Sequence, residues 1–463
     1  MNVTLEDLLG VGHNDAVNIL SLEGKKFTQV STDTRTIQPG ALFVALRGTK
    51  IDGHNFVREA FAKGACCAVV DERSARSDFQ NQPAVIVRDT TIALGELAHR
   101  YRMKFSIPFI AIAGSNGKTT TKEMVGSVLR KRYTVHQTQG NLNNHIGVPA
   151  TLFGVKPQHD IAVVEIGTNH FGEVKNLGGI VHPTHALVTT IENEHLEFFG
   201  SIDGVEQEEG DIFRSLERSG TAFVNCDDER IMRQAQGVRT KVRYGFSSRG
   251  RVRGTVRGFD RRGAAMLSIA AREKKTFDVQ LSLPGRHNAF NALTAAVVGL
   301  SFDVPVRDIR NALRTFRAVD KRMEIHRIDG VVIINDTYNA NADSTIKALQ
   351  SLREMQTPGK KIIILGDMLE LGQASEYEHR KVGDAVARLG FDCLLTFGNI
   401  ARAINDAAGE MAVNLHFDQK NSLAEYALEL IGRGDVVLVK GSRGTKMEDV
   451  VTFLVERKRS KTL

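Results

Sequence analysis

Short apolar runs recur along the whole chain, and most are followed by a segment in which apolar side chains return every three or four residues. Runs of this length, rich in Val and Ile, are typical of strands buried on both faces of a parallel sheet, and the segments between them have the period of helices. Strands are predicted at 42–46, 67–70, 107–113, 160–167, 185–190, 222–225, 331–334, 361–365, 393–397 and 435–440, and helices at 55–63, 92–104 and 289–298.

This alternation predicts an α/β fold built from doubly wound, mostly parallel sheets. A chain of 463 residues is too long for a single hydrophobic core. The strand and helix pattern also restarts near residue 319. We therefore expect three domains, at residues 1–88, 89–316 and 317–463.

The composition favours a soluble protein of a reducing compartment. Hydrophobic residues make up 42% of the chain and charged residues 25%, as in globular proteins. The four cysteines form no C-x-x-C pair, so neither a zinc site nor a disulfide framework is expected. No apolar run is long enough to span a bilayer, and no secretory signal is recognisable. A cytoplasmic monomer without membrane insertion is expected.

The net charge of +7 is concentrated in residues 241–275, which hold eleven Lys or Arg against two Asp or Glu. Apolar and polar residues alternate in this stretch, and glycines recur, so exposed β-hairpins are predicted. The positive charge is therefore attributed to a solvated strand face, and no nucleic-acid partner is expected.

The clearest chemical signal is a glycine loop between a predicted strand and a predicted helix. Its residues are Gly114, Ser115, Asn116, Gly117, Lys118, Thr119 and Thr120. Glycines let backbone N–H groups approach phosphate oxygens, and the start of a helix adds positive potential. Lys118 would neutralise nucleotide phosphates, and the Thr119 hydroxyl would reach Mg²⁺. The first glycine of the usual P-loop spacing would fall at Ile112, so a helix-capping turn with a chance lysine is the alternative.

Other polar residues follow predicted strands, at the edge of a parallel sheet where ligands bind. Glu165 ends an apolar run, and because a buried carboxylate needs a partner or a metal ion, a Mg²⁺ ligand is favoured there. His195 is either functional or structural. Asn143 and Asn144 suit turns or phosphate binding. Polar loops of the first domain could bind a ligand or simply form turns; they contain Ser31, Thr34, Arg35, Asp52, Gly53 and His54.

In this order, the segments resemble the Mur ligases, ATP-dependent enzymes that extend the peptide of the peptidoglycan precursor. The matching segments cover nearly the whole chain: AGSNGKTTTKE, QTQGNLNNHIGVP, VVEIG, HLEFFGS, LPGRHNAFNALTA, NDTYNANADS, LGDMLELG and LVKGSRGTKME. NDTYNAN with LGDMLELG is similar to the members that add D-alanyl-D-alanine to UDP-N-acetylmuramoyl-tripeptide. The D-N-P-R motif of the members that add a diamino acid is absent from the sequence.

The resemblance implies a first domain that binds the UDP-sugar, a central P-loop ATPase-like domain and a C-terminal Rossmann-like domain that binds the incoming dipeptide. It also implies a ligase that uses ATP and Mg²⁺ and forms an acyl phosphate. Such an enzyme serves cell-wall synthesis in the cytoplasm, and through it cell shape and division.

The resemblance further implies roles for single residues. The loop from Gly114 to Thr120 would hold the ATP phosphates; Thr119 and Glu165 would hold one Mg²⁺, and His195 would serve a second. Asn288 and Asn291 would face the adenine, while Arg322 and Asp336 would close over the nucleotide from the last domain. Substrate contacts would come from Ser31, Thr34, Arg35, Asp52, Gly53, His54, Asn143, Asn144, Tyr338, Asn339 and Asn341.

Three positions depart from the family pattern. Many relatives carry a lysine just before the equivalent of Gly210, and that lysine becomes a carbamate that bridges metal. Here the position is Glu209, which keeps an anionic oxygen on a shorter side chain. We expect Glu209 to be a metal partner; the alternative is a solvated helix carboxylate beside Glu208. Glu194 stands where an alanine is usual, and Ala342 where a proline is usual.

Two other functions fit part of this pattern. Another Mur ligase or a folylpolyglutamate-type ligase would use the same loop, but NDTYNAN and LGDMLELG argue against both. A nucleotide-switched binding protein would need the loop but not the predicted metal cluster of Glu165, His195 and Glu209. Amide formation by phosphoryl transfer requires positioning and charge neutralisation rather than a Ser or Cys nucleophile, and no such nucleophile is evident.

Overall fold

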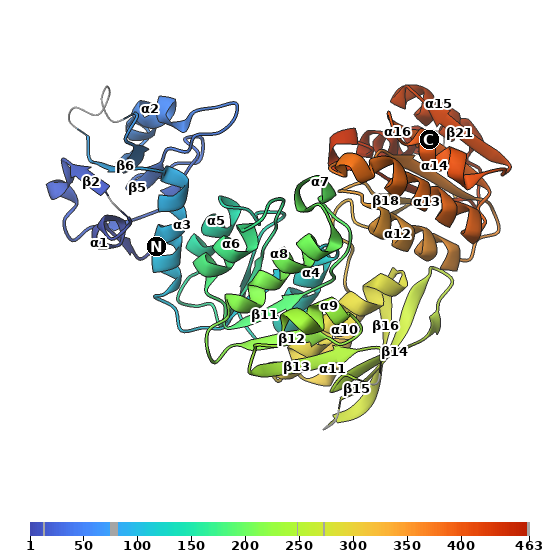
Figure 1. Cartoon of the computed structure of the whole chain (residues 1–463), viewed down its shortest axis with the longest axis horizontal. Helices are drawn as coiled ribbons and strands as arrows, with labels where there is room; N and C mark the ends of the chain where they lie inside the picture. The colour runs from blue at the N-terminus through green and yellow to red at the C-terminus, as the bar shows by residue number, and fades with distance from the viewer. Residues whose placement is uncertain (13, 75–81, 248, 272–273, 461–463) are drawn as a thin grey trace.

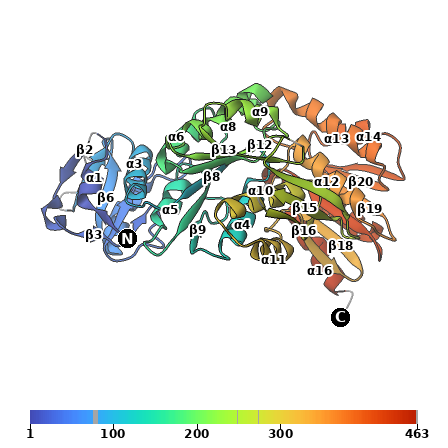
Figure 2. The ribbon, with the colours of Figure 1, turned by 90° about the horizontal axis from the view of Figure 1, so that it is seen from below.

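The computed structural model describes residues 1–12, 14–74, 82–247, 249–271 and 274–460. Three α/β units follow one another along the chain, and each has its own sheet (Figure 1). The first and third units lie at opposite ends of the molecule, with the middle unit between them (Figure 2). The predicted α/β class and three-part architecture are confirmed.

The sheet of the first unit has the order β2-β7-β6-β5-β4, in which only β2 is antiparallel to its neighbour. The predicted strands are β5 and β6, and the predicted helix at 55–63 is divided into a 3₁₀ turn and α2. The elements are β1 (Val3–Thr4), α1 (Leu5–Leu9), β2 (Asn14–Val17), η1 (Ile19–Leu22), β3 (Lys26–Phe27), β4 (Val30–Ser31), β5 (Ala41–Val44), η2 (Gly53–Phe56), α2 (Val57–Ala62), β6 (Ala65–Asp71) and β7 (Ala84–Val87).

The middle unit is built on a sheet of order β16-β15-β14-β13-β12-β11-β8-β10-β9. Its strands are β8 (Phe109–Ala113), β9 (Val135–Gln137), β10 (Ile161–Glu165), β11 (His185–Val188), β12 (Thr221–Asn225), β13 (Thr240–Gly245), β14 (Val252–Phe259), β15 (Ala264–Ala271) and β16 (Lys274–Pro284). Its helices are α3 (Thr90–Arg102), α4 (Lys118–Leu129), α5 (Gly147–Phe153), α6 (Glu173–Val181), α7 (Leu196–Phe199), α8 (Ile202–Arg214), α9 (Glu229–Gln234), α10 (Arg286–Ser301) and α11 (Val306–Arg314).

The packing of helices on both faces of β8 explains why its sequence is apolar without interruption. Phe109, Ala111 and Ala113 pack into one core with α3, α5, α6 and α8. Ile110 and Ile112 pack into the opposite core with α4, α10 and α11. Because successive side chains of a strand point to opposite faces, helices on both sides of the sheet require apolar residues at every position. The loop that follows β8 is thereby anchored in two cores.

The basic stretch 241–275 contains the predicted antiparallel pairing, in β14–β15 and β15–β16, but these strands are not exposed on both faces. Strands β13 and β14 continue the parallel part of the middle sheet, and only β15 and β16 add antiparallel pairs. One face of these strands is buried in the core against α10, through Leu267, Ile269 and Val279. Arg253 and Arg257 are exposed. Apolar and polar residues thus alternate in this stretch because its strands form the outer part of the main sheet. There, one face is covered by a helix and the other is solvated.

The third unit has the sheet order β17-β18-β22-β19-β20-β21, and only β17 is antiparallel. Helices cover both faces of the sheet. The elements are β17 (Glu324–Ile328), β18 (Val331–Asp336), α12 (Ala342–Glu354), β19 (Lys361–Gly366), η3 (Gly372–Ala374), α13 (Ser375–Leu389), β20 (Cys393–Phe397), α14 (Arg402–Ala408), β21 (Val413–Phe417), α15 (Lys420–Leu430), β22 (Val436–Lys440), η4 (Arg443–Thr445) and α16 (Glu448–Ser460). Within the described parts of the chain, no helix is both long and apolar enough to cross a membrane.

Close packing of α10 on α4 gives a test of this fold. A Cβ at Gly299 of α10 would lie 2.4 Å from Val128 Cγ1 of α4. Gly299→Ala should therefore lower the thermal unfolding midpoint, because overpacking costs up to about 3 kcal/mol, whereas alanine gains only about 1 kcal/mol over glycine in a helix. Circular dichroism measures the midpoint.

Gly179→Ala in α6 is the matched control, because a Cβ there meets nothing within 4 Å. Its midpoint should equal or exceed that of the parent. A Gly299→Ala midpoint as high as that of the control would contradict the close approach of α4 and α10.

Candidate active site

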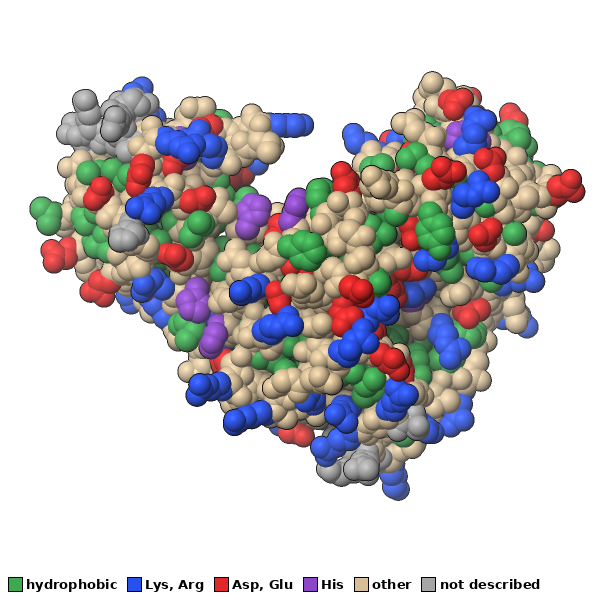
Figure 3. All heavy atoms as spheres, viewed as in Figure 1, with side chains coloured by type: hydrophobic (Ala, Val, Ile, Leu, Met, Phe, Trp, Pro, Cys, Tyr) green, Lys and Arg blue, Asp and Glu red, His purple; other side chains and the backbone are tan. Residues whose placement is uncertain are grey.

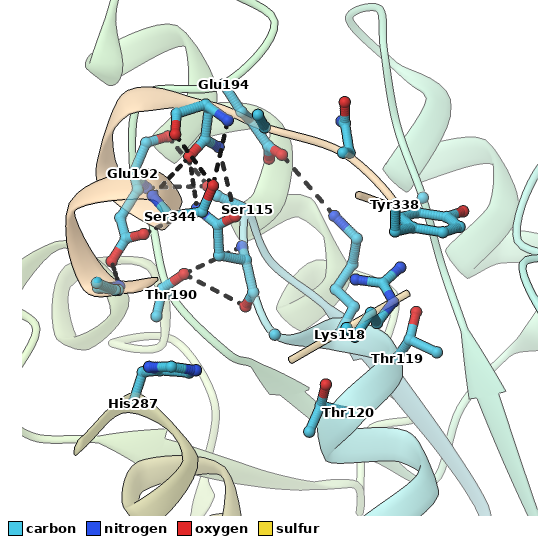
Figure 4. A pocket seen from close by; sticks show the side chains of 18 of the residues that line it. Ser115, Lys118, Thr119, Thr120, Thr190, Glu192, Glu194, His287, Tyr338 and Ser344 are labelled. Carbon is cyan, nitrogen blue, oxygen red and sulfur yellow. Dashed lines mark hydrogen bonds and ion pairs between the residues drawn. The ribbon is translucent and has the colours of Figure 1, made fainter. Parts of the chain in front are cut away.

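A cavity of about 1080 Å³ lies between the middle and third units, where strands β8, β10 and β11 end. Its walls come from the glycine loop and α4, the loops after β9, β10 and β11, the start of α10, and the segments before and after β18. Figure 4 shows that Lys118 points toward Glu194 in this cavity, with Tyr338 of the third unit beside it. The cavity therefore gathers residues that are far apart in the sequence, at the carboxyl edge of the sheet.

The glycine loop has the backbone that its sequence predicts. Gly114 and Gly117 have φ values of 121° and 81°, a region that other residues rarely adopt. A Cβ at Gly114 would lie 2.3 Å from Thr189 Oγ1. Lys118 begins α4, which runs for 12 residues, so the first backbone N–H groups of this helix are available to an anion. The alternative of a simple helix-capping turn does not explain a cavity at this point.

Lys118 is held among carboxylates. Its ammonium donates to the Gly114 carbonyl and lies 3.9 Å from both Glu194 Oε2 and Glu209 Oε1. Burial alone would lower the pKa of Lys118, but the surrounding carboxylates, chiefly Glu194 and Glu209, outweigh it and raise that pKa. Lys118 is thus a fixed positive charge at the start of α4.

Glu209 is fully buried on α8, so the hypothesis of a solvated helix carboxylate is wrong. Its Oε2 accepts a hydrogen bond from the Gly114 N–H at 2.6 Å, and its Oε1 has no hydrogen-bond donor. Burial raises the pKa of Glu209 well above its usual value, against the opposing charge of Lys118. The side chain therefore ties α8 to the glycine loop and leaves one oxygen unused.

Glu208, the next residue, has a different role. Its carboxylate accepts from the N–H groups of Gly172 and Val174, both at 2.7 Å, and from the Thr168 hydroxyl at 3.0 Å. These contacts satisfy orphan N–H groups at the start of α6. Glu208 is therefore a structural carboxylate, although sequence alone does not separate it from Glu209.

Glu165 ends β10 as predicted and is buried. Its Oε1 accepts from the Thr119 hydroxyl at 3.1 Å and from the Asn143 amide at 2.8 Å. Its Oε2 has no hydrogen-bond donor and lies 3.6 Å from Lys122 Nζ. Asn144 is used as a cap, because its side chain accepts from the N–H groups that begin α5.

The predicted metal residues are brought to one cavity but not into one ligand cluster. Among the described residues, no group of three or more His, Cys, Asp and Glu has metal-binding spacing. His195 Nδ1 lies 2.6 Å from Glu370 Oε2 of the third unit. Buried carboxylate oxygens without donors, on Glu165, Glu194 and Glu209, still fit a cation. Mg²⁺ usually takes one or two carboxylates and completes its shell with phosphates and water.

Residues of the third unit complete the wall opposite Lys118. The Arg322 guanidinium lies 3.8 Å from the centroid of the Tyr338 ring. Asp336 accepts from Lys440 Nζ at 2.7 Å and from the Met323 N–H at 3.0 Å, and Lys440 also donates to the Asn339 carbonyl at 2.9 Å. Each oxygen of the Asp336 carboxylate thus accepts one hydrogen bond, and these bonds orient the segments on either side of β18.

Asn288 and Asn291 line the cavity at the start of α10. Asn291 accepts from the Thr121 hydroxyl at 3.2 Å and donates to the Asn288 side chain at 3.2 Å. Asn291 therefore braces α10 against α4, and Asn288 supports it from within α10. Beside them, the rings of Phe246 and Phe290 lie 5.8 Å apart, and both line the cavity. Neither aromatic residue could be recognised as part of a site from the sequence, because Phe246 directly follows an ordinary strand pattern and Phe290 lies in an ordinary helix pattern.

The loop after β11 joins the glycine loop to the third unit. Glu192 accepts from the Asn116 amide at 2.8 Å and pairs with Lys347 of α12. The Asn193 N–H donates to Asp343 Oδ2 at 3.2 Å. Asn341 caps α12 through Ser344, and its amide lies 3.4 Å from that of Asn116. We call Asn116, Glu192, Asn341 and Lys347 the interdomain latch.

Sequence profiles of one family match three segments of this chain. The profile described as "Mur ligase middle domain" matches residues 112–299, "Mur ligase, glutamate ligase domain" matches 321–443, and "Mur ligase family, catalytic domain" matches 26–102. The chain belongs to the Mur ligase family.

Relatives in this Mur ligase family resemble the chain over almost its full length. The UDP-N-acetylmuramoyl-tripeptide--D-alanyl-D-alanine ligase of Escherichia coli (strain K12) is 37% identical, covering 98% of this chain and 99% of its own. A crystal structure of MurF from Acinetobacter baumannii has a TM-score of 0.90 at 30% identity, covering 98% and 99%. The MurF ligase from Thermotoga maritima in complex with ADP has a TM-score of 0.84 at 25% identity, covering 94% and 98%.

In this Mur ligase, the predicted substrate residues of the first unit do not line the cavity. Ser31, Thr34, Arg35, Asp52, Gly53 and His54 are all described, and none belongs to its walls. Figure 3 shows the surface hollowed between the first and third units. A substrate bound to both units would therefore have to bridge this hollow.

These first-unit residues contact one another instead. His54 Nε2 accepts from the Asp71 N–H at 3.0 Å, so its Nδ1 carries the proton and donates to Asp52 Oδ1, 2.7 Å away. Arg47 pairs with both Asp52 and Asp71. Thr34 donates to Glu59 at 3.0 Å. The loops are thus held by their own hydrogen bonds, as the turn alternative also requires.

The interdomain latch can be tested by small-angle scattering. Lys347→Met removes the cation that joins α12 to Glu192 and should let the third unit move away, which increases the radius of gyration. Arg388→Met, at an exposed position of α13, is the control and should leave the scattering curve unchanged. Identical curves for Lys347→Met and the parent would show that the latch does not hold the two units together.

Proposed function

We propose that this Mur ligase joins D-alanyl-D-alanine to UDP-N-acetylmuramoyl-tripeptide at the expense of ATP. The observation that carries the proposal is the cavity between the middle and third units, where Lys118 faces buried carboxylates at the start of α4. The names of the Escherichia coli and Acinetobacter baumannii relatives support the substrates, and the ADP complex of the Thermotoga maritima relative supports the nucleotide. The product is a precursor of peptidoglycan.

The proposed reaction has two steps. The tripeptide carboxylate attacks the γ-phosphorus of ATP, which forms an acyl phosphate and releases ADP. The amine of the dipeptide then attacks the acyl carbon; the C–N bond forms, phosphate leaves, and the amine loses a proton. The backbone N–H groups of the glycine loop and the charge of Lys118 would bind and orient the transferred phosphoryl group.

A divalent cation fits the acidic side of this cavity. Bound Mg²⁺ would supply positive charge at the γ-phosphoryl group. Thr119 and Glu165 would hold one Mg²⁺, and His195 and Glu209 would serve a second. Asn288 and Asn291 are proposed to lie along the adenine side, and Arg322 and Asp336 to cover the nucleotide from the third unit.

The substrates are proposed to divide among three domains, at residues 1–88, 89–316 and 317–463. The first would hold the UDP-sugar through its polar loops, the second ATP, and the third the dipeptide, near Tyr338, Asn339 and Asn341. Asn143 and Asn144 would meet the tripeptide at the edge of the middle sheet. A cytoplasmic monomer is proposed.

Phosphate release in the presence of ATP, Mg²⁺ and UDP-N-acetylmuramoyl-tripeptide tests the proposal. Release should depend on added D-alanyl-D-alanine and should yield the pentapeptide product, measured by mass spectrometry. In a nucleotide-switched binding protein, the amount of phosphate released would not depend on the dipeptide. Dipeptide-independent release without product would overturn the proposed function.

Lys118→Ala should reduce kcat by at least about 100-fold, because removing one stabilising group from a site of developing charge typically costs about 3–4 kcal/mol. The fold should survive, since Lys118 lies at the wall of a cavity rather than in an apolar core. Lys131→Ala, at an exposed position just beyond α4, is the control and should retain parental turnover. Near-normal turnover of Lys118→Ala would contradict the phosphate-binding role.

Glu209→Gln should raise the Mg²⁺ concentration needed for half-maximal phosphate release by about tenfold, as expected from the loss of a charged ligand worth roughly 1.4 kcal/mol. Its thermal midpoint should stay close to the parent's, because an amide oxygen can still accept from the Gly114 N–H. Depletion of bicarbonate should not affect the parent, since a carboxylate needs no carbamate.

Glu208→Gln provides the contrast on the same helix. It should lower the thermal midpoint, because an amide places N–H groups against the donors at the start of α6, but it should leave the Mg²⁺ dependence unchanged. If Glu209→Gln also matches the parent at limiting Mg²⁺, Glu209 is not a metal partner.

A further inference from the structure

Lys122 is a lysine on α4, one turn after Lys118, and its side chain is completely buried (0% exposed). It is not part of the cavity wall. A buried ammonium is unfavourable unless it is paired and hydrogen-bonded. The catalytic scheme described above leaves this charge without a role.

The partners of Lys122 are two carbonyls of the loop after β9 and two carboxylates, of which Glu165 lines the cavity. Its Nζ donates to the carbonyls of Thr138 and Gly140, at 2.8 and 3.0 Å. It also lies 3.1 Å from Glu123 Oε1 and 3.6 Å from Glu165 Oε2. Lys122 therefore joins α4, the end of β10 and the loop after β9.

Glu165 is oriented from two sides. Its Oε1 is on the side of the cavity, where it meets the Thr119 hydroxyl and the Asn143 amide. Its Oε2 has no hydrogen-bond donor and faces the ammonium of Lys122. Because the two oxygens of a carboxylate are fixed relative to each other, a cation at Oε2 determines where Oε1 points.

The loop after β9 is anchored by the same ammonium. Two of its carbonyls accept from Lys122, and the Thr138 hydroxyl accepts from the Glu165 N–H at 3.0 Å. Beyond these anchors, the loop presents Asn141, Asn143 and Asn144 to the cavity. The position of these amides thus depends on a group that itself never reaches the ligand.

We propose that Lys122 is a positioning residue, which holds the Glu165 carboxylate toward Thr119 and the Asn141–Asn144 loop against the end of β10. The inference rests on the proposed function, because Lys122 would act only by positioning residues that hold the cation of the nucleotide site. Without Lys122, Lys118 is a cation that still lies within electrostatic reach of Glu165. The carboxylate would then turn toward the lysine that is needed for phosphate, and away from Thr119.

The test compares Lys122→Met, which keeps the apolar stem and removes the charge, with Lys122→Gln, which also keeps an N–H donor for the Thr138 carbonyl. ADP binding to the full chain is measured by calorimetry, once with excess EDTA and once with saturating Mg²⁺. In EDTA, both variants should bind ADP within about twofold of the parent, because the glycine loop is unchanged. The gain in affinity on adding Mg²⁺ should fall at least tenfold.

Lys458→Met is the matched control, because Lys458 of α16 is also buried and donates to a backbone carbonyl, that of Ile431, at 2.7 Å. It should lower the thermal midpoint and leave the Mg²⁺-dependent gain at the parental value. If Lys122→Met does not fold, Lys122→Gln decides the question.

Two failures are distinguishable. A parent that shows no Mg²⁺-dependent gain would contradict the proposed cation site, and with it the basis of the inference. A parent with a clear gain that Lys122→Met or Lys122→Gln retains in full would show that Lys122 is only structural, and would leave the proposed function intact.

Discussion

The structure depends on the pairing of two lysines on α4 with buried glutamates from three other segments. Lys118 meets Glu194 and Glu209, and Lys122 meets Glu165. Charges in a protein interior are tolerated when they are paired, so each pair constrains the segments that carry it. The end of β10, the loop after β11 and helix α8 are therefore held around the glycine loop. The proposed phosphate site lies where these pairs meet.

The third unit is fastened to the same centre through polar contacts. Glu192 joins Asn116 of the glycine loop to Lys347, and His195 reaches Glu370. The hydrogen bond from His195 holds the pKa of Glu370 below its usual range. Small polar interfaces of this kind allow domains to move relative to each other. The proposed nucleotide site thus lies at the boundary between two units, and its glycine loop carries contacts to the third unit.

The sequence could predict whatever depends on local pattern. Strand β8, the glycine loop and Glu165 at the end of β10 follow from short segments whose chemistry is evident without neighbours. The partners across the fold could not be predicted, because nothing local distinguishes Glu209 from Glu208. Adjacent residues of a helix point about 100° apart, so one carboxylate reaches the glycine loop and the other caps α6. His195 shows the same limit: its place at a strand end was evident, but its contact with Glu370 depends on how the third unit docks.

Water can hydrolyse an acyl phosphate before the amine attacks, so a ligase must exclude water while it admits the second substrate. The cavity of this chain is lined by the middle unit on one side and by Arg322, Tyr338 and their neighbours on the other. Neither unit alone encloses it. In the proposed reaction, the contacts that bring the third unit onto the glycine loop would decide when the intermediate is protected. The residues that order this loop would then also affect whether activation of the carboxylate leads to an amide bond or to hydrolysis.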